Sequence, residues 1–270
     1  MKENNKFFFV ISRNESFGWY YYIQFVLEVI MKLYLPIGLM AFVLLFLPIP
    51  ALAVDICYML TWLFAAFILF AEIKYGKDLR SLPRLLFYAV LEILAVSISF
   101  TRVIINGDRS VLYKYISALN YNFIVNIVLA VAIMIALFIL TKKGVERTVQ
   151  VALEFSLETM PQLFFDVDNE LSKGTITPEE AAQKKKEIQM DIDFCSCMDG
   201  SEKFLLGCVK ALFFIYSVAV VGGSVSGILY NALTWQEALL QYSFLALWNV
   251  VLHTVPLIML DIAVIHAIKH

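Results

Sequence analysis

Charged residues are scarce over most of this chain. Of its 270 residues only 16% are charged, 61% are hydrophobic, and the mean hydropathy is +0.78. A soluble domain has about 25% charged and roughly 45–50% apolar residues. The apolar residues gather in blocks of about 20, the length that crosses roughly 30 Å of hydrocarbon as a helix. The composition excludes an ordinary soluble domain and predicts an all-α, polytopic membrane protein.

A basic excess, a disulfide framework and catalytic motifs are also missing. The chain has 21 Lys and Arg against 23 Asp and Glu, which argues against nucleic acid as a partner. Three of its four cysteines (Cys195, Cys197 and Cys208) cluster in or beside a segment expected to be cytosolic, and they lack zinc-ligand spacing. No nucleophile elbow, phosphate loop or triad is present. We therefore expect no enzyme activity, metal or cofactor.

The apolar residues form six runs, which predict six membrane spans. The last run is too long for one straight span. Asn249, His253 and Pro256 fall in its middle, so we expect a bent or broken helix there, facing a polar cavity. The expected spans cover residues 33–48, 51–71, 85–105, 121–141, 204–230 and 237–268.

One polar insert, residues 142–203, interrupts this pattern between the fourth and fifth spans. It holds 21 of the chain's 44 charged residues and should face water. Thr177-Pro178 with Glu180 predicts a helix that starts with a capping box and runs to about residue 194. Residues 199–201, Asp-Gly-Ser, are expected to turn the chain and cap the fifth span.

The positions of Lys and Arg near the span ends predict the orientation in the membrane. The loop 72–86 carries four of them, and the start of the insert carries three, whereas the loops at 48–53 and 231–236 carry none. Because basic residues gather on the cytosolic side, the insert and both termini should be cytosolic. The expected organisation is a cytosolic tail and interfacial segment (1–32), four spans (33–141), the insert (142–203) and two spans (204–268).

The insert carries a set of motifs at fixed separations. Asp168 falls seven residues after Pro161, and a Met-Asp-Gly triplet is followed by Lys-Phe two residues later. The matching residues are Lys143-Gly144, Glu146-Arg147, Met160-Pro161, Asp168, Glu170, Asp193-Phe194, Met198-Asp199-Gly200, Lys203-Phe204 and Gly207. With these the chain resembles the FHIPEP family of flagellar and type III secretion export-gate proteins.

This resemblance implies a function in protein secretion across the bacterial inner membrane. Family members form a homo-oligomeric ring with other export-gate membrane proteins and couple the proton-motive force to export. Exported proteins would be indirect partners. The family continues into two more spans and a large cytosolic domain, whereas this chain ends at His270, so we expect the membrane half only.

Five charged residues are candidates for proton coupling. Asp168 lies at a signature position, and its neighbours Asp166 and Glu170 could favour its protonated form by like-charge repulsion. The alternative is a solvated acidic loop. Arg102 and Glu92 lie within one expected span, where ionisable groups are functional candidates, although Arg102 could instead extend to the outer surface.

Three departures from the family pattern leave two alternative functions open. Gln162 stands within the segment where the family has a Lys, and Cys208 and Asn249 stand where it has Asp. These departures favour a shortened relative that assembles without conducting protons. His253 and Asp261, with Glu92 and Arg102, would instead allow an independent ion or solute transporter.

Six further residues are expected to be structural members of the signature. They are Arg147, Pro161, Asp199, Gly200, Lys203 and Phe204.

Overall fold

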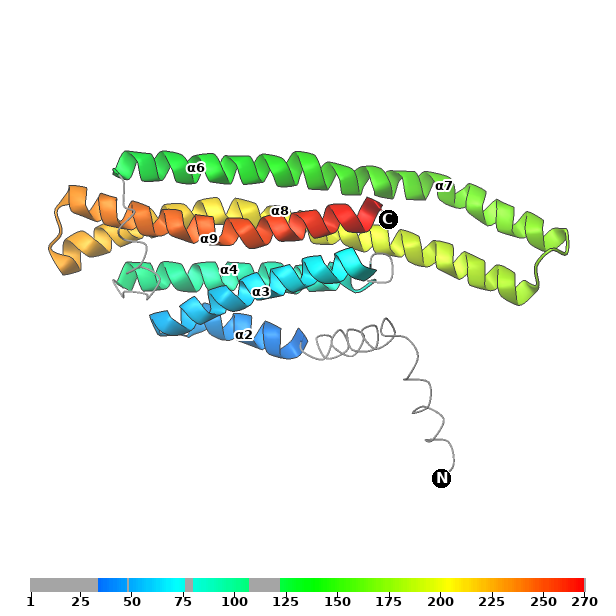
Figure 1. The fold of residues 1–270 in the computed structure, drawn as a ribbon, viewed down its shortest axis with the longest axis horizontal. Coiled ribbons are helices and arrows are strands. Elements are labelled where there is room, and N and C mark those ends of the chain that lie inside the picture. Colours follow the sequence, from blue (N-terminus) through cyan, green and yellow to red (C-terminus); the bar gives the residue numbers. More distant parts are fainter. Residues whose placement is uncertain (1–33, 48, 76–79, 107–121, 270) are drawn as a thin grey trace, which may run out of the picture.

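The structure, a computed structural model, describes residues 34–47, 49–75, 80–106 and 122–269, and every regular element in these ranges is a helix. This confirms the all-α prediction. Figure 1 shows the helices as one elongated bundle from which two of them project at one end. The elements are α2 (Tyr34–Phe46), α3 (Ala51–Tyr75), α4 (Leu82–Asn106), α6 (Phe123–Ile139), the π-helix η3 (Leu140–Glu146), α7 (Arg147–Ser172), α8 (Pro178–Asn231) and α9 (Trp235–Lys269).

Five of the described helices are long and apolar enough to cross a membrane. They confirm a polytopic membrane protein. The described part of the first expected span, α2, has 13 residues, which is less than the roughly 20 that a span needs. The count of six spans therefore stays a prediction. Large apolar side chains such as Leu63, Phe214 and Val221 are exposed on the bundle, as lipid-facing side chains are.

Helix α4 forms the centre of the bundle. It packs against α2, α3, α8 and α9. Its buried residues recur along its whole length, from Leu82 to Ile104, because both ends lie inside hydrophobic clusters. One cluster lies toward the projecting helices, and the other lies toward the opposite end of the bundle.

Two glycines let α8 and α9 approach closely near that opposite end. A Cβ added at Gly223 would lie 2.3 Å from Cδ1 of Tyr242, and one at Gly227 would lie 2.5 Å from its Cε2. The Tyr242 ring is therefore seated against the bare backbone of α8, the use of small residues that is typical of membrane helix contacts. On the side of α8 that meets α4, Ser226 Oγ donates to the carbonyl of Ile105 at 2.6 Å.

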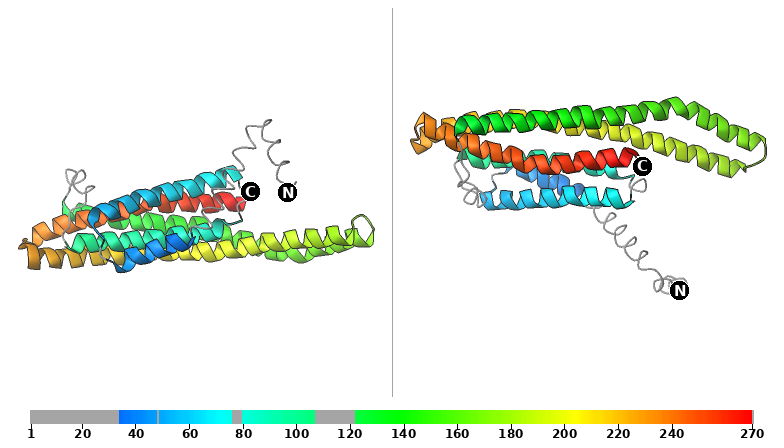
Figure 2. Two further views of the ribbon diagram at one scale, coloured as in Figure 1. Left: turned by 90° about the horizontal axis from the view of Figure 1, so that it is seen from below. Right: turned by 45° about the horizontal axis from the view of Figure 1, so that its top comes forward.

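The polar insert is a helical hairpin continuous with the bundle, as Figures 1 and 2 show. Residues Phe123–Ser172 form one helical rod of 50 residues, and α8 has 54. At 1.5 Å per residue each rod is about 75–80 Å long, far beyond the roughly 30 Å of a bilayer core. The two rods must therefore extend out of the apolar layer, and residues 173–177 connect them at the tip.

The predicted turn at residues 199–201 is wrong, as is the predicted helix end near residue 194, because α8 runs through both without a break. Gly200 costs a helix about 1 kcal/mol relative to Ala. Tertiary contacts on either side outweigh this. Met198 is fully buried, and Ser201 Oγ donates to the carbonyl of Pro83, next to the start of α4, at 2.9 Å.

The predicted break in the last apolar run is also wrong, since α9 continues through Pro256. Proline has no N–H, so the carbonyl of Leu252 loses its helical donor. Trp62 Nε1 of α3 donates to this carbonyl at 2.8 Å. A side chain of a neighbouring helix replaces the missing bond, which is how proline is tolerated inside membrane helices.

Candidate functional site

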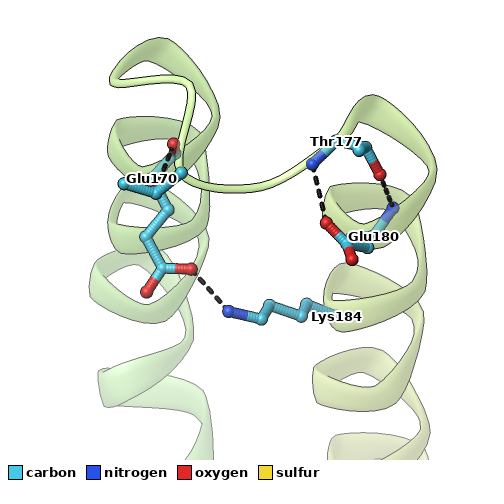
Figure 3. A network of polar contacts seen from close by, with 5 residues as sticks. Glu170, Thr177, Glu180 and Lys184 are labelled. Atoms are coloured by element: carbon cyan, nitrogen blue, oxygen red, sulfur yellow. Dashed lines mark hydrogen bonds and ion pairs between the residues drawn. The ribbon is translucent and has the colours of Figure 1, made fainter.

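The tip of the hairpin brings the signature acids of α7 opposite lysines of α8. Lys185 Nζ lies 2.6 Å from Asp168 Oδ1, and Lys184 Nζ lies 2.5 Å from Glu170 Oε2. The Asp168 side chain is 56% exposed, so its ion pair lies in contact with solvent. Figure 3 shows the Glu170 pair beside the connection between the helices. These contacts join the two rods across the hairpin.

The predicted capping box at the start of α8 is confirmed. Thr177 N donates to Glu180 Oε2 at 2.8 Å, and Glu180 N donates to Thr177 Oγ1 at 3.2 Å (Figure 3). The hydrogen bond from the Thr177 backbone contributes most to stabilising the Glu180 carboxylate, and a hydrogen bond from the Thr177 side chain adds to it. Together they hold the pKa of Glu180 below its ordinary value. The box fixes where α8 begins and hence how the tip is closed.

Asp166, Asp168 and Glu170 do not form a single acidic cluster. They lie on a continuous helix, where residues two apart point to different sides. Asp166 is exposed, and the described contacts pair Asp168 and Glu170 each with a lysine rather than with one another. The structure thus gives Asp168 a basic neighbour in place of the repulsive acids expected.

Arg102 meets no acid among its described contacts. Its guanidinium donates to the carbonyls of Leu44, Leu45 and Leu47 at the end of α2, at 2.8 Å for Leu47. Carbonyls in the last turn of a helix have no helical donor, and a cation there also opposes the helix dipole. Arg102 therefore caps α2, beside a cavity of about 300 Å³ that includes Pro50 and Asn106.

Glu92 of α4 is buried, at 3% exposure. It lies against Thr61 and Cys57 of α3. A carboxyl enclosed between two membrane helices is costly to keep unless it has a function or a firm polar partner. Of the five sequence candidates, Glu92 is the one that the structure buries.

The structural signature residues gather where the hairpin meets the bundle. Lys203 Nζ lies 2.6 Å from Asp199 Oδ2, four residues back on α8. The Phe204 ring stacks on Phe87 of α4 with centroids 4.7 Å apart. Arg147 begins α7, and Pro161 lies inside it. With Gly200, which has open space beside it, these residues line the two rods and their base.

A buried polar network was not predicted as a unit. Tyr58 of α3 donates to Asn249 Oδ1 at 2.5 Å, and its hydroxyl lies 3.2 Å from His253 Nδ1. Asn249 Nδ2 donates to Thr101 Oγ1 of α4 at 3.3 Å. Asn249 and His253 were noted as polar residues in the middle of the last apolar run, but nothing near Tyr58 in the sequence identified it as their partner.

Four more acids are buried within the described helices: Asp55, Glu72, Glu202 and Asp261. Glu72 Oε1 lies 3.7 Å from His266 Nδ1, and Thr141 Oγ1 donates to Asp261 Oδ2 at 2.8 Å. The sequence pattern singled out Asp261 but neither Glu72 nor Glu202. Both stand at the edges of apolar runs, where a solvated acid is the ordinary expectation. Within the described ranges no group of three or more acids, His or Cys is arranged to hold a metal ion.

Comparison with known sequences identifies the family. The FHIPEP family profile matches residues 41–266, most of the chain. The chain belongs to the FHIPEP family. The match includes the hairpin, Glu92, Arg102 and all the signature residues, and it confirms the resemblance drawn from the motifs.

Individual relatives come from both flagella and secretion systems. The chain is 29% identical over 230 residues to the flagellar biosynthesis protein FlhA of Borreliella burgdorferi, covering 80% of this chain and 32% of that protein. It is 28% identical to the secretion system apparatus protein SsaV of Salmonella typhimurium, covering 83% and 34%. It is 30% identical to the low calcium response locus protein D of Yersinia pestis, covering 80% and 31%.

The chain thus spans about a third of the length of the curated relatives it matches. No solved structure shows a significant match to it.

Proposed function

We propose that this chain is a membrane component of a flagellar or type III protein export gate that couples the proton-motive force to secretion. The observation that carries the proposal is the family match over residues 41–266, which includes the whole hairpin and its signature acids. The names of the relatives place both branches of the family, flagellar and secretory, among the candidates.

The hairpin is the part suited to transmit a signal between the membrane and the export apparatus. Each of its rods continues into a membrane span as unbroken helix, so a movement of the span can be passed along the rod to the tip. At the tip, a proton on Asp168 would cancel the charge that holds Lys185. Exposed ion pairs contribute only about 0.2–1 kcal/mol, so this contact can open and close reversibly.

The orientation and the partners belong to the same proposal. Basic residues near the span ends favour a cytosolic hairpin and cytosolic termini in the inner membrane. Copies of this chain, forming a ring, and other export-gate membrane proteins would be its partners. Exported proteins would then meet the gate from the cytosolic side, where the hairpin projects.

An Asp168→Asn substitution tests the proposal in cells that depend on this chain for export. We expect secretion to fall sharply while membrane insertion and assembly persist, because Asn keeps the shape of the side chain but cannot exchange a proton. Glu154→Gln is the matched control, since Glu154 is an exposed acid on the same helix that is not one of the five candidates. Unchanged secretion in Asp168→Asn would favour the assembling, non-conducting relative.

Buried acids in the bundle favour a second candidate, an ion transporter that works alone. Glu72, Glu92, Glu202 and Asp261 are each at most 3% exposed. Proton flux into vesicles that contain only the purified chain would favour this candidate. The export-gate proposal predicts no such flux without the other gate proteins.

A further inference from the structure

Two buried acids lie where the hairpin joins the bundle, far along α8 from the exposed acids of the tip. Glu202 of α8 is 0% exposed, and Asp261 of α9 is 2% exposed. The charge of Asp261 is one of those that act on Glu202. The two acids are thus neighbours across the contact of α8 with α9, which is one of the large contacts in the bundle.

Neither acid has the donors that a buried carboxylate needs. Among the residues that the structure describes, both oxygens of Glu202 and Oδ1 of Asp261 lack a hydrogen-bond partner. The one described donor is Thr141 Oγ1, at 2.8 Å from Asp261 Oδ2. A carboxylate removed from water without such donors is unfavourable, whereas a proton removes the charge and supplies an O–H that can donate to the neighbouring carboxylate.

The other charged groups that face Glu202 are Glu146 of η3, and Asp199 and Lys203 of α8. Lys203 lies 2.6 Å from Asp199, and its side chain is 55% exposed, so this cation is already paired and in contact with solvent. Glu146 and Asp199 are both acidic. Within the described part of the chain, the surroundings of Glu202 thus hold two further negative charges and no cation that is hydrogen-bonded to Glu202.

The π-helix η3 delivers the remaining groups of this cluster. Thr141 and Glu146 are five residues apart, near its two ends. Hydrogen bonds in a π-helix join residues five apart, which brings them to the same side, whereas in an α-helix they would not share a face. The π-helix therefore presents Thr141 to Asp261 and Glu146 toward Glu202 from one side of the rod.

We propose that Glu202 and Asp261 form a proton-binding site that holds one proton between the two carboxyls, with Thr141 as a donor to Asp261. The site is separate from the signature acids at the tip. Loss of the proton would leave two charges facing each other across α8 and α9, beside η3, and would loosen the base of the hairpin. Only this consequence for export rests on the proposed function, and the binding of the proton does not.

Infrared spectroscopy of the purified full chain in detergent tests the site directly. We expect the C=O band of buried protonated carboxyls at neutral pH to lose intensity in Glu202→Gln and in Asp261→Asn and to lose most in the double variant, where Glu72 and Glu92 are buried acids that can still contribute. Glu179→Gln, an exposed acid in the first turn of α8, is the matched control and should leave the band unchanged. A native spectrum without the band, or a band whose intensity neither substitution changes, would overturn the proposal.

If a variant does not fold, a second measurement can be made on the native chain. Labelling the glutamate carboxyls with ¹³C should shift the band, because Glu202 holds a share of the proton. A band that does not move on glutamate labelling or on aspartate labelling would contradict the site without any substitution.

The proton-binding site and the proposed function can fail independently, and the infrared and secretion experiments tell the two failures apart. If the band behaves as expected but Asp168→Asn leaves secretion unchanged, the proposed function fails and the site stands. If Asp168→Asn stops secretion but the band is unaffected by the two substitutions, the site fails and the proposed function stands.

Discussion

The bundle and the hairpin are built from the same two long helices by different means. In the bundle, α8 buries its glycines against Tyr242, and polar groups such as Asn249 and His253 are enclosed by neighbouring helices. In the hairpin, α7 and α8 are connected at the tip by exposed ion pairs. The bundle is held by close packing and buried polar contacts. The hairpin buries fewer apolar side chains, among them Val167, Ala181 and Ile192, and its tip is held by weak contacts with solvent access.

This difference assigns different tasks to the two regions. Close packing tolerates little change, so substitutions in the bundle should affect stability first. Exposed ion pairs contribute little to stability, so substitutions at the tip should affect function at almost constant stability. The comparison can be tested by paired substitutions, one in each region.

The largest effect is expected from Gly223→Ala in the bundle. The added Cβ would lie 2.3 Å from the Tyr242 ring, so α8 and α9 would have to separate. Overpacking costs roughly 1–3 kcal/mol, and we expect the upper end or more because a rigid ring is in the way. Thermal unfolding of the purified chain in detergent measures this loss.

Gly200→Ala is the control at the base of the hairpin. A Cβ there meets nothing within 4 Å, so helix propensity alone should stabilise the variant by up to about 1 kcal/mol. Equal destabilisation by both substitutions would remove the distinction between the two regions.

A middle-sized effect is expected for Trp62→Phe, which removes the donor to the Leu252 carbonyl. The loss should be about 0.6–2 kcal/mol, the range for hydrogen bonds between membrane helices. In a Pro256→Ala background the alanine N–H can bond to the same carbonyl, so Trp62→Phe should cost less. A double-mutant cycle in detergent measures the difference. Equal costs in both backgrounds would show that Trp62 does not compensate for the proline.

The smallest effect on stability is expected at the tip, from Lys185→Met. This change removes the partner of Asp168 but leaves the two rods and the capping box in place. We expect a loss of about 0.2–1 kcal/mol that shrinks in high salt, since both side chains are exposed. A salt-independent loss of several kcal/mol would place the tip in the same class as the bundle.

Local signals in the sequence were enough for part of this structure. The apolar runs predicted the membrane helices, and Thr177 with Glu180 predicted the start of α8, because caps depend on residues three apart. The capping role of Arg102 was not foreseen, since its acceptors lie more than 50 residues away.

Continuity of the long helices depends on contacts that a local pattern does not contain. Gly200 and Pro256 were interpreted as interruptions, and distant partners (the carbonyl of Pro83 and the indole of Trp62) compensate for both. The π-helix at Leu140–Glu146 has no sequence signal that we recognise. Its neighbours Glu202 and Asp261 are far apart in the sequence, and the packing of α8 against α9 brings them together.

The central claim is that the charged insert is a rigid helical hairpin, and one crosslink tests it most directly. Ser156 Oγ of α7 lies 3.8 Å from Cys195 Sγ of α8, so a cysteine at position 156 should form a disulfide with native Cys195 under mild oxidation. We expect this bond in Ser156→Cys and in Ser156→Cys with Cys197→Ser, and its loss with Cys195→Ser. Two free thiols at positions 156 and 195 after oxidation, in a variant that inserts normally, would contradict the hairpin.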